Sequence, residues 1–402
     1  MRTFREEARL LALTASARLI PRRQAEPDPP RRVLVIRPDH MGDLLLSVPA
    51  LRHLKASIPD CYLGLLIGPW NAEAARGIPH VDEVLTLPFP WFDRRPTAGL
   101  LHPYRLLLAE ATRLRTGRWD TALVLRHDFW WGAMLAAWAD IPRRIGYGSP
   151  EALPFLTHSV PYKVAHEVEQ TMALAEALSG RQSYPMELEF RASMEDAEAA
   201  GVWLAEQGLV GSFAVVHPGA GAPVKEWNAG KFAAVIAGLA LPVVVTGSPG
   251  EEALARAVAG PAGARLLVGA PLGQVAAVLA RASLAIGVDS GIMHLAAAVG
   301  TPTVRLFGPA DASRFGPWGD PNLQRVVRSE PACVPCNRLE FSPGELPLHP
   351  CMRSIPVEAV LAAAQPLLAA VESRRGHAQS AGQGAHDPWT LDSGSPQPCV
   401  SA

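Results

Sequence analysis

Several features that define large classes of protein are absent from these 402 residues. No stretch of 18 apolar residues occurs, which excludes a conventional transmembrane helix. The N-terminus has neither a continuous apolar segment nor a small-residue cleavage site, so we expect no secretory signal peptide. Lys plus Arg, 37, and Asp plus Glu, 38, nearly cancel. This balance argues against a uniformly basic, nucleic-acid-binding chain.

Cysteine and lysine are both scarce. Five cysteines are an odd and small number for a disulfide framework, so we expect a cytoplasmic location. Only four of the 37 basic residues are lysines, Lys55, Lys163, Lys225 and Lys231, and the other 33 are arginines. A bias towards Arg, Ala and Pro is typical of GC-rich genomes. Because lysine is rare in this chain, each lysine is a candidate for a specific role.

The first 31 residues predict a basic amphipathic leader and a linker. Within residues 1–20, the spacing predicts a helix whose apolar face holds Phe4, Ala8, Leu11, Ala15 and Leu19. Residues 1–32 contain eight arginines and four acidic residues, a net charge of +4. Such a segment favours peripheral contact with an anionic membrane, here the cytoplasmic face of the inner membrane. A disordered or solvated leader is the alternative.

Beyond the leader, short apolar runs alternate with helical patterns in two series. The expected strands are 33–36, 62–67, 84–87 and 122–125, followed by 213–216, 243–246, 266–268, 284–288 and 303–307. This alternation predicts an α/β protein with two doubly wound, Rossmann-like domains, 32–190 and 205–372, facing a central cleft. An irregular stretch near 180–210 would separate them. Residues 373–402, rich in Gly, Ser, Gln and Pro, predict a disordered tail.

A loop with an acidic residue follows the first expected strand. Gly42 permits a tight turn or a close approach of the backbone in this loop. Asp43 would stand at the start of the next helix. The Asp43 carboxylate either caps that helix or acts as a general base that takes a proton from a hydroxyl group. Asp39 and His40 are neighbouring candidates for the same role.

Residues 217–228 form a glycine-rich loop after the first strand of the second series. Gly219 and Gly221 leave backbone N–H groups open to an anion. Lys225 adds a mobile positive charge suited to a phosphate, and Asn228 is an expected N-cap of the next helix. An ordinary loop with a solvated lysine is the alternative.

A third loop leads a buried strand into a helix that begins near Ser290. Ser290 and Gly291 lie where the first N–H groups and the dipole of that helix attract a phosphate. One turn further, His294 either contacts the ligand or packs in the core. Glu251, after another strand, either binds ribose hydroxyls or caps its own helix. Three such loops favour nucleotide-diphosphate binding by the second domain.

Together these motifs resemble glycosyltransferase family 9, the ADP-heptose:lipopolysaccharide heptosyltransferase family. The resemblance spans about residues 32–365 and is carried by segments 33–51, 217–227, 287–294 and 300–309. It implies a GT-B fold and an inverting, metal-independent transfer without a cofactor or nucleic acid. The sugar, heptose from ADP-heptose, would pass to a lipopolysaccharide core or a related surface glycan.

By the same resemblance, Asp43 is the general base and Lys225 neutralises charge on the departing diphosphate. The resemblance assigns donor binding to Gly42, His217, Gly219, Gly221, Trp227, Glu251, Asp289, Ser290, Gly291 and His294. The absence of an Asp-x-Asp motif from these loops agrees with transfer that needs no metal. A nucleotide-sugar epimerase or hydrolase of the same architecture, or a non-catalytic nucleotide-sugar binding protein, are the alternatives.

The Cys-rich segment 333–351 and the first domain supply further candidates. Cys333, Cys336, His349 and Cys351 resemble a ligand set for structural zinc, with a thiol cluster or a disulfide as the alternatives. The first domain should bind the acceptor. Its aromatic segment 127–131 suits sugar rings or lipid but would also suit a core. Arg126, Arg143 and Arg144 suit the phosphates of an acidic glycolipid, or are simply solvated.

Overall fold

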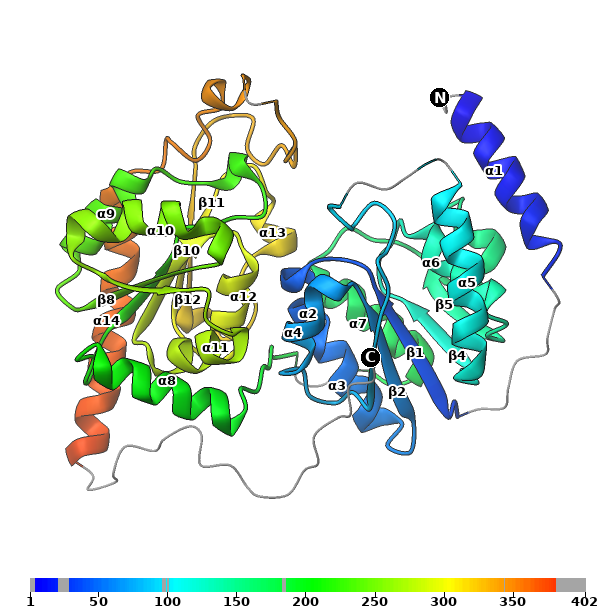
Figure 1. Cartoon of the computed structure of the whole chain (residues 1–402), viewed down its shortest axis with the longest axis horizontal. Helices are drawn as coiled ribbons and strands as arrows, with labels where there is room; N and C mark the ends of the chain where they lie inside the picture. Colours follow the sequence, from blue (N-terminus) through cyan, green and yellow to red (C-terminus); the bar gives the residue numbers. More distant parts are fainter. Residues whose placement is uncertain are drawn as a thin grey trace. The chain divides into compact units, whose positions relative to one another are not determined.

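The computed structural model describes residues 4–20, 29–95, 99, 101–182, 186–342 and 344–380 (Figure 1). The chain divides into two compact units, the first ending at Met186 and the second beginning at Glu187. Each unit contains one six-stranded sheet in which all neighbouring strands are parallel.

Unit 1 has the strand order β3-β2-β1-β4-β5-β6. Its strands are β1 (Arg32–Arg37), β2 (Tyr62–Ile67), β3 (Glu83–Thr86), β4 (Thr121–Val124), β5 (Arg143–Tyr147) and β6 (His158–Val160). Its helices are α1 (Phe4–Ala17), α2 (Met41–Leu46), α3 (Val48–Ser57), α4 (Ala72–Ala75), α5 (His102–Thr116), α6 (Trp130–Trp138) and α7 (Glu167–Ser179).

Alternating side chains of β1 enter the two layers that cover its sheet. Leu34 and Ile36 belong to a core shared with the buried side chains of α5 and α6. Val33 and Val35 are also fully buried, and they point to the opposite face because successive strand residues alternate. Figure 1 shows α5 and α6 on one side of the sheet and the paired helices α3 and α7 on the other. A strand buried on both faces explains the continuous apolar run.

Unit 2 repeats this plan with the order β12-β11-β10-β7-β8-β9. Its strands are β7 (Ala214–His217), β8 (Val243–Gly247), β9 (Arg265–Val268), β10 (Leu284–Val288), β11 (Thr303–Phe307) and β12 (Gln324–Arg328). Its helices are α8 (Met194–Glu206), α9 (Ala229–Gly238), α10 (Glu252–Ala259), α11 (Leu272–Arg281), α12 (Gly291–Ala298), α13 (Ala312–Phe315) and α14 (Val357–Ser380). Helices α9, α10 and α14 pack on one face, with α8, α11 and α12 in the other layer.

Both sheets change winding direction beside their first strand. The chain builds β1, β2 and β3 outwards and then returns to place β4 on the other side of β1; β7 and β10 are related in the same way. In doubly wound sheets, ligands bind beyond the carboxyl ends of the strands at this switch point. Ligand binding is therefore expected at the loops after β1 and β4 in unit 1 and after β7 and β10 in unit 2.

Some expectations need correction. Strands β5, β6 and β12 were not expected, and α8 occupies part of the stretch expected to be irregular. Helix α14 continues to Ser380, past the expected start of the tail at 373, while residues 381–402 lie outside the described residues. Among the described residues, no helix is both long and apolar enough to cross a membrane.

The leader helix exists as α1, but its packed face differs from the predicted one. Leu13 is buried in the unit 1 core, and Ala17 and Ile20 pack against the same core. The predicted apolar positions Ala8, Leu11, Ala15 and Leu19 are all exposed, and the Phe4 side chain lies outside the described residues. Because α1 is apolar on two sides, periodicity alone does not decide which side packs.

Candidate active site

Asp43 lies in the first turn of α2, just beyond the carboxyl end of β1. The turn between them leaves His40 at the N-cap position with an extended backbone and no capping bond from its side chain. Gly42 is the second residue of α2 rather than part of the tight turn expected there. The Asp43 side chain remains 30% exposed, so a substrate can reach its carboxylate.

The guanidinium of Arg37, the last residue of β1, contacts both the backbone and the carboxylate of Asp43. One of its nitrogens, Nη2, donates hydrogen bonds to Glu167 Oε1 at 2.8 Å and to the backbone oxygen of Asp43 at 3.2 Å. The same nitrogen lies 3.7 Å from Asp43 Oδ1, and Arg37 Nε lies 3.3 Å from Asp39 Oδ2. Arg37 is fully buried. A buried cation thus joins three carboxylates.

This cluster changes the acidity of its members. Burial, reinforced by the Asp39 carboxylate and opposed by Arg37, raises the pKa of Asp43 to about 7. Burial by itself would lower the pKa of Arg37, but Asp39, Glu167 and Asp43 raise it well above its usual value. A carboxylate with a pKa near neutrality is a better proton acceptor than an ordinary one, and at pH 7 it is still partly ionised.

The neighbouring candidates Asp39 and His40 are less suited to accept a proton. The Asp39 carboxylate is buried and ion-paired with both Arg37 and Arg126. Its backbone oxygen also accepts hydrogen bonds from Trp70 Nε1 at 3.0 Å and Asn71 Nδ2 at 2.8 Å. Burial and nearby Arg94 lower the pKa of His40. The geometry therefore favours Asp43 among the three.

Only some side chains of the aromatic segment 127–131, expected to contact the acceptor, lie outside the buried core. Of segment 127–131, Phe129 and Trp131 are buried in the core. His127 stacks on Tyr162 with ring centroids 4.3 Å apart, and Trp130 packs against the exposed Trp91.

The three expected acceptor arginines also differ in how their side chains are held. Arg144 donates to the backbone oxygens of Ile141 and Phe155 and so fastens β5 within its own unit. Arg126 is paired with Asp39 and Asp128. Arg143 begins β5 and is half-buried.

In unit 2, the register of the sheet brings two of the expected donor loops together. Gly287 of β10 pairs with His217 of β7, so the loops after these strands leave the sheet side by side. Across them, Lys225 Nζ lies 2.9 Å from Asp289 Oδ2, and both side chains are largely buried. The single cation of the glycine-rich loop is thereby anchored at the start of α12.

Some residues of the expected sugar-donor loops are buried or cap a helix. The Trp227 side chain is buried and donates from Nε1 to the backbone oxygen of Ile355 at 3.3 Å. The His217 ring is buried beside the Thr246 oxygen, and burial lowers the His217 pKa. Asn228 caps α9 by accepting from the Lys231 N–H, as predicted.

Glu251 and Gly219 meet across two loops. Glu251 Oε2 accepts from both the backbone N–H and the hydroxyl of Ser248 at 2.8 Å, which makes Glu251 part of a capping box. Its Oε1 lies so close to Gly219 that a Cβ there would stand 2.0 Å away. Gly219 is therefore required for this close approach. Gly221 is exposed in the same loop.

The start of α12 combines an uncapped helix end with buried polar groups. Ser290 is the N-cap residue, yet its hydroxyl makes no capping bond and is buried without a hydrogen-bond partner. Gly291 is the first helical residue. His294 is buried, and its Nδ1 lies 3.1 Å from Arg305 Nη1. Arg305, on β11, also donates to the Met293 oxygen at 2.7 Å.

Comparison with known proteins identifies the family of this chain. The sequence pattern of glycosyltransferase family 9 (heptosyltransferase) matches residues 108–343, more than half of the chain. The chain belongs to glycosyltransferase family 9. Lipopolysaccharide heptosyltransferase 3 of Escherichia coli (strain K12) is 25% identical over 350 residues, covering 81% of this chain and 95% of that protein.

Solved structures of family 9 proteins share the fold. The structure of E. coli ADP-heptose lps heptosyltransferase II matches with a TM-score of 0.67 and 22% identity, covering 85% of this chain and 99% of that one. The family 9 glycosyltransferase of Veillonella parvula matches with a TM-score of 0.70 and 22% identity, covering 85% and 97%. This family 9 chain therefore has the GT-B fold, with two Rossmann-like sheets.

The zinc candidates of this family 9 chain do not form a ligand set. Within the described residues, no group of three or more His, Cys, Asp or Glu side chains could hold a metal ion. Cys333 and Cys336 are exposed, whereas Cys351 is buried and burial raises its pKa. The His349 ring packs on Phe341 with centroids 3.8 Å apart. The segment therefore offers thiols of different exposure rather than a preformed zinc site.

Sequence reasoning missed two buried residues of the candidate site. Glu167 begins α7, and Arg305 lies in the middle of β11. A charged residue inside the apolar run 303–307 was the available signal for Arg305, because an arginine is almost never fully buried without partners. Glu167 gave no such signal, because an acidic residue in the first turn of a helix is common.

Proposed function

We propose that this family 9 glycosyltransferase transfers a heptosyl group from ADP-heptose to a hydroxyl of a lipopolysaccharide core or related glycan. The names of its relatives support this donor and acceptor: a lipopolysaccharide heptosyltransferase in sequence, and an ADP-heptose lps heptosyltransferase in fold. The observation that carries the proposal is Asp43, a reachable carboxylate at the switch point of unit 1 whose pKa is raised to about 7.

Asp43 is the proposed general base. Its carboxylate accepts the proton of the acceptor hydroxyl as the hydroxyl oxygen forms a bond to the anomeric carbon of the donor sugar. The bond from that carbon to the diphosphate oxygen breaks, and ADP carries away its electron pair. Because the acceptor attacks from the side opposite the leaving group, the anomeric configuration is inverted.

Arg37 is proposed to orient this base rather than to touch the substrate. Its hydrogen bond to the Asp43 backbone oxygen fixes the first turn of α2, and Glu167 holds the guanidinium from the other side. Because Arg37 and Glu167 are both buried, they can orient Asp43 without competing with the acceptor for space. Fixing a reacting group in this way lowers the entropy lost on reaching the transition state.

Lys225 and the start of α12 are proposed to stabilise the leaving diphosphate. In the free protein the Lys225 ammonium is paired with Asp289, so a bound diphosphate would draw on a cation that is already positioned. Ser290 and Gly291 would place the first N–H groups of α12 and the Ser290 hydroxyl beside it. Charge that develops on the leaving group is met by these groups, so the proposed reaction requires no metal ion.

A transfer assay tests the proposal. Purified chain is incubated with ADP-heptose and a heptose-deficient lipopolysaccharide core acceptor, and both ADP release and product glycan are measured. Transfer by the wild type and its loss in Asp43→Asn, with ADP binding unchanged, is the expected result. Release of ADP without glycan product would favour the hydrolase alternative. Transfer retained by Asp43→Asn would remove Asp43 as the base.

A further inference from the structure

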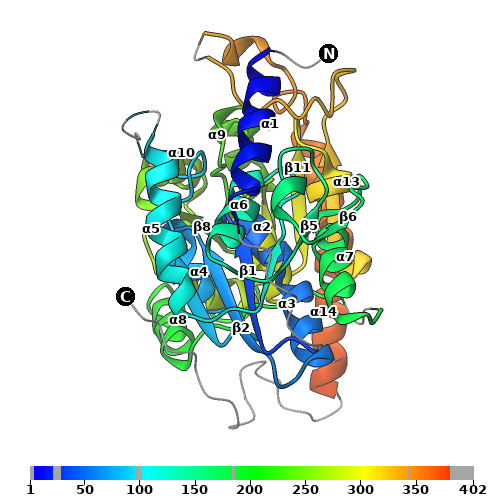
Figure 2. The ribbon, with the colours of Figure 1, turned by 90° about the vertical axis from the view of Figure 1, so that its right-hand side faces the viewer.

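Arg305 is a fully buried arginine beside the start of α12. It is the middle residue of β11, which lies between β10 and β12 in the sheet of unit 2 and is labelled in Figure 1 and, from a direction turned by 90°, in Figure 2. Its guanidinium contacts Met293 and His294. Both residues belong to the first turn of α12, next to Ser290 and Gly291 of the proposed diphosphate site.

The contacts of this guanidinium fix the first turn of α12 and the ring of His294. Nη2 donates to the Met293 oxygen at 2.7 Å, and Nε donates to Thr303 Oγ1 at 3.3 Å. Nη1 lies 3.1 Å from His294 Nδ1. Because a guanidinium group only donates hydrogen bonds, Nδ1 must accept, which leaves the imidazole hydrogen on Nε2. Among the described residues, no carboxylate is hydrogen-bonded to Arg305.

Arg37 of unit 1 shows how a buried arginine is usually accommodated. It is also fully buried, but three neighbouring carboxylates raise its pKa. Burial lowers the pKa of Arg305 to about 9, and the opposing negative charge is that of Asp289. The Asp289 carboxylate is already paired with Lys225 at 2.9 Å. Arg305 is therefore a buried cation at pH 7 that shares one carboxylate with a second cation.

The position of Arg305 against α12 makes this arrangement less favourable still. The first turn of a helix is the positive end of its dipole, which disfavours a cation and favours an anion. Buried charges are normally paired. An anion bound at the start of α12 would supply the missing negative charge, and the diphosphate of a nucleotide sugar is such an anion. The unfavourable charge of the free protein would thus be offset when the diphosphate binds.

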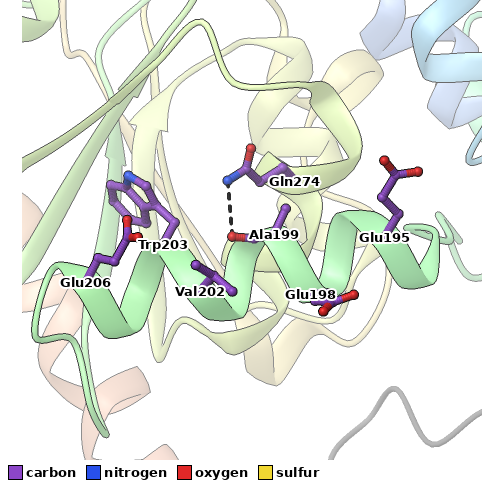
Figure 3. Close-up of a pocket in the computed structure, with 7 residues that line it drawn as sticks. All are labelled: Glu195, Glu198, Ala199, Val202, Trp203, Glu206 and Gln274. Atoms are coloured by element: carbon purple, nitrogen blue, oxygen red, sulfur yellow. Dashed lines mark hydrogen bonds between the residues drawn. The ribbon is translucent and has the colours of Figure 1, made fainter.

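The groove along α8 is not a competing site for this anion. Figure 3 shows the groove, which has a volume of about 470 Å³ and is lined by three acidic side chains, Glu195, Glu198 and Glu206. Carboxylates on one side chain after another would repel a diphosphate. Within the described part of unit 2, the start of α12 is therefore the better place for the negative charge that Arg305 lacks.

We infer that Arg305 is a positioning residue of the donor site. Its guanidinium holds the first turn of α12 and the His294 ring, and its buried charge favours a diphosphate at the start of that helix. The inference rests on the proposed function, because it takes the donor diphosphate to bind there. It adds that affinity for the donor depends on a charge from the core of unit 2 as well as on Lys225.

Binding of ADP and of adenosine to the full chain tests the inference, because the two ligands differ by the diphosphate. Isothermal titration with ADP and ligand-observed NMR with adenosine compare the wild type, Arg305→Gln and Arg305→Lys. Arg305→Gln keeps a donor but loses the charge, so it should bind ADP roughly tenfold more weakly. Its affinity for adenosine should be unchanged. Arg305→Lys keeps the charge and should restore most of the affinity for ADP.

Arg281 supplies the matched control. It is a half-buried arginine of the same unit, on α11, and its Nη2 donates to the Ala197 oxygen of α8 at 3.2 Å. Arg281→Gln therefore removes one positive charge from unit 2 without changing the first turn of α12. It should bind both ADP and adenosine as the wild type does.

Thermal unfolding separates this role from a merely structural one. Arg305→Gln removes a buried cation that has no hydrogen-bonded carboxylate, so its Tm without ligand should be no lower than that of the wild type. The rise in Tm caused by ADP should be smaller than in the wild type, because ligand stabilisation follows affinity. A residue needed only for folding would lower the ligand-free Tm instead.

Each outcome supports or overturns the inference. Weaker ADP binding in Arg305→Gln, with adenosine binding kept and ADP binding restored in Arg305→Lys, supports it. Unchanged ADP binding, equal loss of ADP and adenosine, a lower ligand-free Tm, or an equal loss in Arg305→Lys or Arg281→Gln overturns it. If the wild type binds GDP or UDP instead of ADP, the proposed donor is wrong, and the same comparison with that nucleotide decides the role of Arg305. A wild type that binds no nucleoside diphosphate overturns both.

Discussion

Arg37 and Glu167, 130 residues apart in the sequence, form a buried ion pair with 2.8 Å between Nη2 and Oε1. The pair joins the end of β1 to the start of α7, and the same guanidinium nitrogen reaches Asp43. Removing one partner of a buried pair leaves the other as an uncompensated charge. Glu167 is therefore expected to matter for both folding and catalysis, although it lies beneath the reacting groups.

Replacing Glu167 separates these two effects. Glu167→Ala should lower the free energy of unfolding by about 3 kcal/mol, because Arg37 loses a buried partner. Glu167→Gln keeps a hydrogen-bond acceptor and should cost less. The Glu167 carboxylate is one of the charges that raise the Asp43 pKa, so in Glu167→Gln the rise of kcat with pH should move to lower pH. Urea unfolding and a pH–rate profile measure the two effects.

Glu169 supplies a matched control for this experiment. It lies in the same first turn of α7 but is exposed, where its side chain accepts from the His166 N–H. Glu169→Gln should leave the pH–rate profile in place. An unchanged profile in Glu167→Gln would show that Glu167 has a purely structural role.

The raised pKa of Asp43 predicts two opposite dependences on pH. Activity should rise with pH through about pH 7, because the base must be ionised. The free energy of unfolding should fall as the pH rises towards 7. The reason is that Asp43 binds its proton more tightly in the folded state than in the unfolded state, where its pKa is near 3.9. The loss of stability begins near pH 4 and is complete once the pH exceeds the folded pKa of about 7.

Asp43→Asn tests both halves of this prediction. It removes the proposed base and should lower kcat by about 10²- to 10⁴-fold. It also removes the ionised carboxylate, so its Tm should exceed that of the wild type at pH 8, and this advantage should shrink as the pH falls towards 4. Thermal scans at pH 4, 6 and 8 are sufficient. A Tm difference that does not vary with pH would contradict the raised pKa.

Chelation should leave this protein unchanged. The thiols of Cys333, Cys336 and Cys351 differ in exposure, and within the described residues they belong to no metal-ligating group. The proposed stabilisation of the leaving group also depends on Lys225 and α12 rather than on an ion. EDTA should therefore alter neither Tm nor the rate of transfer, and metal analysis should find well under one equivalent of zinc or iron. A stoichiometric metal, or a fall in Tm with EDTA, would contradict this expectation.

The sheets of this fold were predictable where strands were buried on both faces. Strands β2, β10 and β11 have the predicted bounds, because continuous aliphatic runs between helical patterns have few other interpretations. The sequence did not predict strand β5, because it begins with Arg143 and Arg144 and contains Gly146. These residues do not favour a strand. Its place is decided by pairing with β4, which is a tertiary effect.

The candidate site was predictable only at its loops. Glycines and charges after strands drew attention to Asp43, Lys225 and Ser290, which do lie at the switch points of their sheets. The buried partners, Glu167 and Arg305, come from elements far along the chain. The sequence alone does not indicate which helix N-terminus packs against the end of which strand, so these contacts could not be predicted.

Lys225 of the glycine-rich loop and Lys231 of the following helix α9 allow a direct test of donor binding. Lys225 Nζ pairs with Asp289 at the start of α12, whereas Lys231 Nζ donates to the backbone oxygens of Arg353 and Ile355. Lys225→Met should therefore weaken ADP binding about tenfold or more and lower the rate of transfer, because a charge-assisted contact to the diphosphate is lost. Lys231→Met should lower stability but leave ADP affinity unchanged. Isothermal titration with ADP compares them, and equal loss of affinity in both variants would show that Lys225 is not a specific diphosphate ligand.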